Sequence, residues 1–104
     1  MTEKKLQTLR IKELESEGYY VIKLIKTNKN GIPDLIAIKS NEVLFVEVKR
    51  KNGILSELQK YRLKELNEHG FKTEVYNGIM NLTKVLLIRY HLYPHRIGLM
   101  YFLK

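Results

Sequence analysis

Three ionisable residues at the ends of two apolar segments give the clearest chemical signal in the sequence. Asp34 precedes the apolar run 35–38, and Glu47 and Lys49 stand at the end of the apolar run 43–48. Two carboxylates can hold a divalent metal ion that polarises a phosphate, while a lysine orients the attacking water or stabilises charge in the transition state. A salt bridge between Glu47 and Lys49 is the alternative, and each residue taken alone favours it. The three charges together favour a metal site for phosphate chemistry.

The spacing of these residues predicts that they meet on one hairpin. An even-length turn at 40–41 places Asp34 opposite Glu47, whereas an odd-length turn would break this pairing. Directly opposed side chains lie about 4.5–5.5 Å apart, so two carboxylates there need a cation between them, such as Mg²⁺. Because side chains alternate along a strand, Lys49 shares a face with Glu47.

Gln59 is a candidate to support this site. It lies between Leu55, Leu63 and Leu66 on the inward face of a predicted helix, where an amide needs polar partners. Ser56 and Gln59 also match a capping box, which would explain the glutamine without any site. The two interpretations are compatible, and the sequence alone leaves them even.

A glutamate of the first helix is a weaker candidate. Glu3, Glu13 and Glu17 all lie near the inward side of that helix, so helical periodicity does not choose among them. A solvated glutamate at the helix start, favourable to the helix dipole, is the alternative for Glu3.

The elements that must position these residues follow the order αβββαβ, a mixed sheet flanked by helices. The first helix has Thr2 as its N-cap and Leu6, Leu9 and Leu14 on one side. The two strands of the hairpin are apolar on both faces and should be central. The predicted elements are a helix over 2–17, strands over 19–25, 33–38 and 43–49, a helix over 55–69, a strand over 71–76, and a possible helix over 81–91.

Composition places these elements in one small, basic domain. The chain has 104 residues and a net charge of +8, which suggests a polyanionic partner, with nucleic acid first; a basic but inert surface is an equal alternative. There is no cysteine, which excludes thiolate zinc sites and cysteine nucleophiles, and no membrane span or secretory signal is evident, so we expect a cytoplasmic protein of a bacterial or phage-infected cell. The candidates for phosphate contact are Lys23, Lys26, Lys29, Arg50, Lys51, Lys60 and Arg62.

Three motifs resemble, in this order, those of the VRR-NUC family (virus-type replication-repair nucleases) of the PD-(D/E)XK superfamily. They are G-I-P-D at 31–34, E-V-K at 47–49 and L-S-x-x-Q at 55–59. The resemblance covers about residues 3–76 and implies a PD-(D/E)XK restriction-endonuclease-like α/β core. It also implies a nuclease cutting DNA with Mg²⁺ or Mn²⁺.

The resemblance also assigns roles to single residues. It implies that Asp34, Glu47 and the Val48 carbonyl are metal ligands, that Lys49 is catalytic and that Gln59 supports the site. The family carries a glutamate about fifteen residues before the glycine that ends the first helix, and this spacing selects Glu3 over Glu13.

The expected function is a structure-specific endonuclease, a homodimer cutting branched DNA such as Holliday junctions. The alternatives are a nicking or end-processing nuclease, a catalytically silent DNA-binding module, and a basic RNA-associated protein. A chain this short buries only a small core, so a partner would stabilise it, and the apolar segment 97–103 could form the dimer interface. The role of residues 79–104 stays open.

Overall fold

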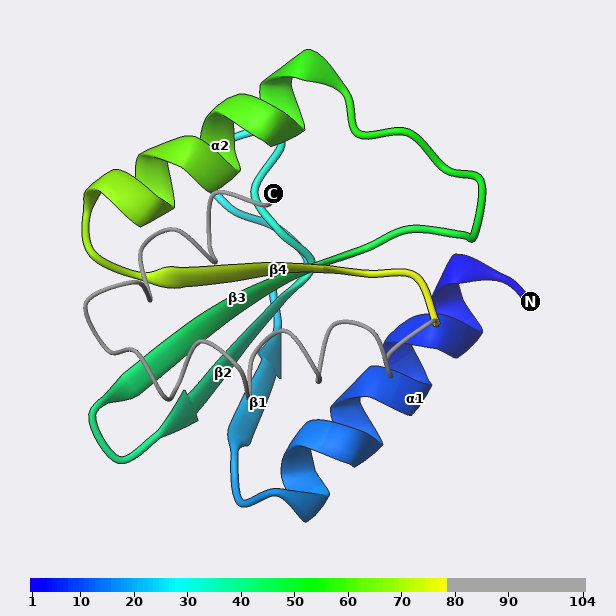
Figure 1. Cartoon of the computed structure of the whole chain (residues 1–104), viewed down its shortest axis with the longest axis vertical. Helices are drawn as coiled ribbons and strands as arrows, with labels where there is room; N and C mark the ends of the chain where they lie inside the picture. The colour runs from blue at the N-terminus through cyan, green and yellow to red at the C-terminus, as the bar shows by residue number, and fades with distance from the viewer. Residues whose placement is uncertain (79–104) are drawn as a thin grey trace, which may run out of the picture.

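One four-stranded sheet lies between two helices in a computed structural model that describes residues 1–78 (Figure 1). The predicted order αβββαβ is confirmed. The possible helix over 81–91 and the segment 97–103 lie outside the described residues. The elements are α1 (Glu3–Ser16), β1 (Tyr20–Lys23), β2 (Leu35–Lys39), β3 (Glu42–Val48), α2 (Glu57–Glu68) and β4 (Lys72–Tyr76).

The strands stand in the order β1-β2-β3-β4, so β2 and β3 are central as predicted. β1 pairs antiparallel with β2, and β2 pairs antiparallel with β3, whereas β4 runs parallel to β3. The hairpin has the even-length turn, with Lys39 opposite Glu42 and Leu35 opposite Val46. Ser40 adopts a left-handed conformation (φ 52°) within this turn. The expected register is therefore correct, and it brings Asp34 and Glu47 to the same end of the hairpin.

α1 packs its buried side chains on one face of the sheet. Thr2 caps the helix by accepting a hydrogen bond from the backbone N–H of Lys5 at 3.1 Å. Leu6 and Leu14 are buried against the sheet, but the prediction for Leu9 is wrong, because 41% of its surface is exposed. Arg10, one position further along, is buried instead. The apolar core on the α1 side of the sheet therefore contains a buried guanidinium, which is paired with the buried carboxylate of Glu74.

The edges of several elements differ from the sequence-based bounds. β1 ends at Lys23 rather than Ile25, which is 87% exposed, because the chain leaves the sheet there to reach α2. α2 begins after Ser56, so Leu55 precedes the helix and is not part of its inward face. Leu63 is the fully buried side chain of α2. Within residues 1–78 no helix has the length and apolar character that crossing a membrane requires.

The loop between β1 and β2 is fixed to α2. The backbone N–H of Leu24 donates to the Asp34 carbonyl at 2.8 Å and closes the base of the loop. Arg62 of α2 donates through Nε to the Asn30 carbonyl at 2.8 Å. Gly31 has φ +80°, and a Cβ there would lie 2.7 Å from Cγ of Leu58. The glycine thus allows both the turn and the close approach that deliver Asp34 to the end of β2.

Candidate active site

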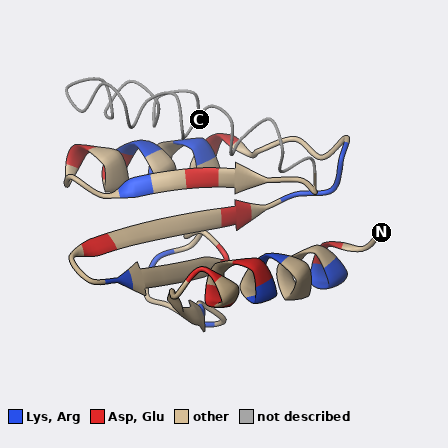
Figure 2. Ribbon diagram, turned by 60° about the horizontal axis from the view of Figure 1, so that its bottom comes forward, with Lys and Arg blue, Asp and Glu red and all other residues tan. Residues whose placement is uncertain are grey.

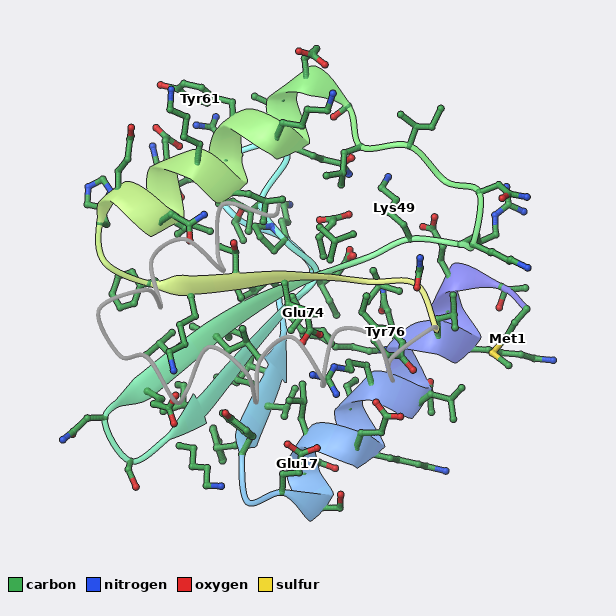
Figure 3. All side chains as sticks on the ribbon, viewed as in Figure 1. Met1, Glu17, Lys49, Tyr61, Glu74 and Tyr76 are labelled. Carbon is green, nitrogen blue, oxygen red and sulfur yellow. The ribbon has the colours of Figure 1, made fainter. Side chains whose placement is uncertain are left out.

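The predicted site residues meet at the end of β3, on the α2 side of the sheet. Glu47 is the next-to-last residue of β3, Lys49 follows the strand, and Asp34 directly precedes β2. Figure 3 shows Lys49 on the same side of the sheet as α2, while Figure 2 shows the acidic end of β3 followed by the basic loop. The site is therefore framed by two strands, one helix and the loop that joins β3 to α2.

Asp34 is tied to the neighbouring strand by its side chain. Its Oδ2 accepts a hydrogen bond from the backbone N–H of Val48 at 2.8 Å. The regular ladder between β2 and β3 ends one pair earlier, at Leu35 and Val46. The carboxylate thus continues the pairing of the two strands where backbone bonds stop. This contact fixes the position of the Asp34 carboxylate at the end of the hairpin.

Glu47 is held in place by Gln59. Only 3% of Glu47 is exposed, and its Oε2 accepts a hydrogen bond from Nε2 of Gln59 at 3.2 Å. The capping box is present too. The Gln59 side-chain oxygen accepts a hydrogen bond from the backbone N–H of Ser56 at 2.9 Å, and the backbone N–H of Gln59 donates to the Ser56 hydroxyl at 3.1 Å. One amide group therefore caps α2 with its oxygen and orients Glu47 with its nitrogen.

The electrostatics of Glu47 differ sharply from those of a surface glutamate. Burial raises its pKa from 4.5 to about 8, and the negative charge of Asp34 and a hydrogen bond between the two carboxyl groups add to the rise. Lys49 opposes the shift without cancelling it. Two acidic groups that share one small space in this way repel each other when both are ionised. A cation bound between them would relieve that repulsion.

Glu3 approaches the same site from α1. Its charge also contributes to the raised pKa of Glu47. The start of α1 lies beside the loop after β3, since Met1 lines a cavity of about 390 Å³ together with residues 50–53 (Figure 1). Glu13, the competing candidate, is instead bound to Arg10, with 3.0 Å between Oε1 and Nη1. Of these two glutamates, the structure places Glu3 near the candidate site.

The oxygen atoms at the site fit a hard divalent ion. Besides the hydrogen bonds from the Val48 N–H and the Gln59 amide, the carboxyl groups of Asp34 and Glu47 contact each other, and a shared cation could replace that contact. The Val48 N–H points toward Asp34, and the N–H and C=O of a strand residue point to the same neighbour, so the Val48 carbonyl faces Asp34 as well. Within residues 1–78 no three or more acidic, histidine or cysteine side chains gather as a metal-binding group. Two carboxylates and a carbonyl suit Mg²⁺, which retains several of its waters.

The predicted phosphate contacts fall into two groups. Arg50 and Lys51 are exposed on a turn closed by the Gly53 N–H, which donates to the Arg50 carbonyl at 2.7 Å. Lys23, Lys26 and Lys29 are exposed at the end of β1 and on the loop that docks on α2. On α2 the cations are already paired: Lys60 lies 3.0 Å from Glu57, and Arg62 lies 2.8 Å from Glu65. Within residues 1–78, the predicted phosphate contacts that form no salt bridge are therefore those at the end of β1 and on the two loops.

A buried ion pair near the site was not predicted. Arg10 and Glu74 are 3% and 6% exposed, and two hydrogen bonds of 2.7 Å join the guanidinium to the carboxylate. The available signal was the position of Arg10 between Leu6 and Leu14 on the inward stripe of α1, four residues from each. A buried arginine requires a buried acidic partner, and Glu74 is an acidic residue in the middle of β4.

Comparison with known proteins agrees with this geometry. The sequence model of the VRR-NUC domain matches residues 3–80. One solved structure, described as a VRR_NUC domain, is 26% identical with a TM-score of 0.70, covering 81% of this chain and 92% of the other. A second, a VRR_NUC domain protein, is similar in fold at 24% identity and a TM-score of 0.69, covering 88% and 90%. A comparison with curated protein sequences finds no match. The chain belongs to the VRR-NUC family, whose domain is a nuclease module of DNA processing.

Proposed function

We propose that this protein is a metal-dependent DNA endonuclease that hydrolyses phosphodiester bonds with Mg²⁺ or Mn²⁺ held by Asp34, Glu47 and the Val48 carbonyl. The observation that carries the proposal is the contact between the carboxyl groups of Asp34 and Glu47 at one end of the hairpin, where burial, together with the charge of Asp34, raises the pKa of Glu47 to about 8. A buried pair of like charges is costly for a fold unless a cation is to be bound there. A bound divalent ion would polarise the scissile phosphate and lower the pKa of a water molecule.

The chain's own residues account for the remaining tasks. Lys49 follows Glu47 on the same face, so its ammonium group can donate to the attacking water or to a phosphate oxygen. Gln59 fixes one oxygen of Glu47 and thereby aims the other. Glu3 adds a further negative charge at the edge of the site. Loss of a hydrogen bond that orients a metal ligand commonly lowers metal affinity about 10- to 100-fold.

We further propose branched DNA as the substrate and a homodimer as the active form. A net charge of +8 and exposed lysines and arginines on two loops support a polyanionic substrate. Symmetric cleavage of a junction needs two sites related by a two-fold axis. In support of an interface, β1 exposes Tyr20 by 70% and Ile22 by 41%.

Labelled linear, nicked and four-way DNA, each incubated with Mg²⁺, Mn²⁺ or EDTA, will test the activity and its preference. Asp34→Ala, Glu47→Ala and Lys49→Ala should each lower cleavage by orders of magnitude, because such residues act as a unit. Exposed Glu15 supplies the control, Glu15→Gln. Full activity of Asp34→Ala would refute the proposal, and equal cleavage of all DNAs by a monomer would favour the nicking function.

A thermal melt separates the metal site from an ordinary ion pair. Asp34→Asn keeps an oxygen for the Val48 N–H but removes one charge beside Glu47. The variant should be at least as stable as wild type in EDTA, and Mg²⁺ should raise the melting temperature of wild type alone, because a ligand stabilises only the state that binds it. Identical responses of the two proteins to the metal would show that Asp34 is not a ligand.

A further inference from the structure

The Arg10–Glu74 pair joins the helix and the strand that border the site. Arg10 donates through Nε to Oε2 and through Nη2 to Oε1 of Glu74, both at 2.7 Å. Its Nη1 donates to Glu13 at 3.0 Å, and its guanidinium lies over the Tyr76 ring, 5.3 Å from the centroid. Figure 3 shows Glu74 and Tyr76 on the side of the sheet that faces α1. The guanidinium of Arg10 is thus held by two carboxylates and one aromatic ring.

The contact between Arg10 and Glu74 pairs two buried charges and also restricts how α1 is oriented relative to β4. Burial works against the charge of Arg10, but the carboxylates of Glu74 and Glu13 outweigh it and raise the pKa of the guanidinium. A two-pronged arginine–carboxylate contact is planar and directional, unlike the contact of a lysine ammonium. Apolar neighbours such as Leu6 and Leu14 allow a helix to slide or rotate by small amounts, whereas this contact permits one rotation and one axial position.

Arg10 and Glu74 each lie on an element that also contacts or carries a residue of the candidate site. Glu3 and Arg10 are seven positions apart on α1, which is about two turns, so they lie on the same stripe of the helix. Glu74 pairs with Val46 of β3 and stands two residues before Tyr76, whose carbonyl accepts the backbone N–H of Lys49 at 2.9 Å. The ion pair therefore connects the helix that carries Glu3 to the strand edge that holds Lys49.

We propose that Arg10 is a positioning residue: its two-pronged contact with Glu74 sets the rotation and axial position of α1, and thereby holds Glu3 at the edge of the site, near enough for its charge to act on Glu47. The proposal rests on the metal site proposed above and adds a determinant of metal affinity remote from the ligands. Arg10 acts through Glu3 and does not itself touch the metal or DNA.

Variants that separate stability from geometry test the proposal. Removing one partner leaves a buried unpaired charge, but replacing both with apolar residues of similar size is often neutral or stabilising, so Arg10→Met with Glu74→Leu should fold. Arg10→Lys keeps the charge and loses the fork. Glu3→Gln removes the group that is positioned, and Asp34→Asn removes a proposed ligand.

Mn²⁺ affinity measured by titration calorimetry is the first readout. The Arg10→Met/Glu74→Leu protein and the Arg10→Lys protein should each bind Mn²⁺ about as weakly as Glu3→Gln, at least several-fold below wild type. Adding Glu3→Gln to the double variant should cause no further loss. Wild-type affinity in the double variant, or losses that multiply in the triple variant, would overturn the proposal. Wild-type affinity in Asp34→Asn would instead overturn the metal site itself.

A distance measurement without metal gives the second readout. Because the chain has no cysteine, spin labels can be attached to Lys5→Cys on α1 and Glu68→Cys on α2, both of which are exposed. We expect a narrow distance distribution in the otherwise wild-type protein and a broader or shifted one in Arg10→Lys and in the apolar double variant. Unchanged distributions in folded variants would show that the pair contributes stability alone and would refute the positioning role. If the double variant does not fold, Arg10→Lys decides.

Discussion

Raising the pH of the metal-free protein from about 5 to about 8 should lower its free energy of unfolding, and Glu47→Gln should remove most of that loss. The pKa of Glu47 is raised from 4.5 to about 8 in the folded protein. Between these two values the folded state binds more protons than the unfolded state. Stability from this group is therefore fully present below the unfolded pKa and is lost as the pH rises toward the folded pKa.

The size of the effect follows from the same two values. A rise of the pKa from 4.5 to about 8 corresponds to roughly 5 kcal/mol, at about 1.4 kcal/mol per pH unit. Because only 3% of Glu47 is exposed, little of this is screened directly by solvent, although local relaxation and water entry reduce it. We expect a difference of at least about 2 kcal/mol between wild type and Glu47→Gln over this range. For a small domain, about 2 kcal/mol is a large part of the total stability.

Urea unfolding in EDTA at several pH values measures this difference. The glutamine retains an oxygen to accept the Gln59 amide, so the variant removes the titration with little change in shape. All other ionisable groups are common to both proteins, so their contributions cancel in the comparison. Glu15→Gln, at an exposed position of α1, should follow wild type. Parallel curves for wild type and Glu47→Gln would refute the raised pKa and the crowding of Asp34 against Glu47.

Three further outcomes follow from the geometry. Gly31→Ala should destabilise the protein by about 1–3 kcal/mol more than Gly70→Ala in thermal unfolding. Both glycines have positive φ, but nothing lies within 4 Å of a Cβ at Gly70. Equal losses of stability would therefore contradict the clash at Gly31. Ser56→Ala should cost about 1 kcal/mol, and an unchanged urea midpoint would show that the cap contributes nothing. Replacing Arg50 or Lys51 with alanine should each reduce the log–log salt slope of DNA binding by about one, measured by fluorescence anisotropy, and unchanged slopes would remove both from the phosphate contacts.

The hairpin and its turn were predictable because their signals are local. An alternation of two residues and a two-residue turn define the register between β2 and β3, and a shift by one residue would move every side chain to the opposite face. The sequence therefore predicted correctly that Asp34 and Glu47 reach the same end of the sheet. For Gln59 the sequence left a helix cap and a site contact as even, compatible interpretations, and the structure has both contacts.

Contacts between segments distant in sequence were not predictable in the same way. Helical periodicity placed Leu9 on the buried side of α1, although the structure buries Arg10, because a guanidinium can replace a leucine only where a strand supplies the matching carboxylate. That carboxylate belongs to Glu74, which is 64 residues away. Helical periodicity also could not choose between Glu3 and Glu13, and the structure shows that Glu13 is bound to Arg10.

The two buried glutamates, Glu74 and Glu47, have different electrostatic surroundings. Glu74 accepts two hydrogen bonds of 2.7 Å from Arg10, so a cation already lies against its carboxylate, although burial still raises its pKa. Glu47 is equally buried, but the largest charge effect on its pKa is the like charge of Asp34, which Lys49 opposes without cancelling. Because a carboxylate bound to a guanidinium needs no external cation, whereas two like charges in contact do, we expect the proposed metal ion at Glu47 and not at Glu74.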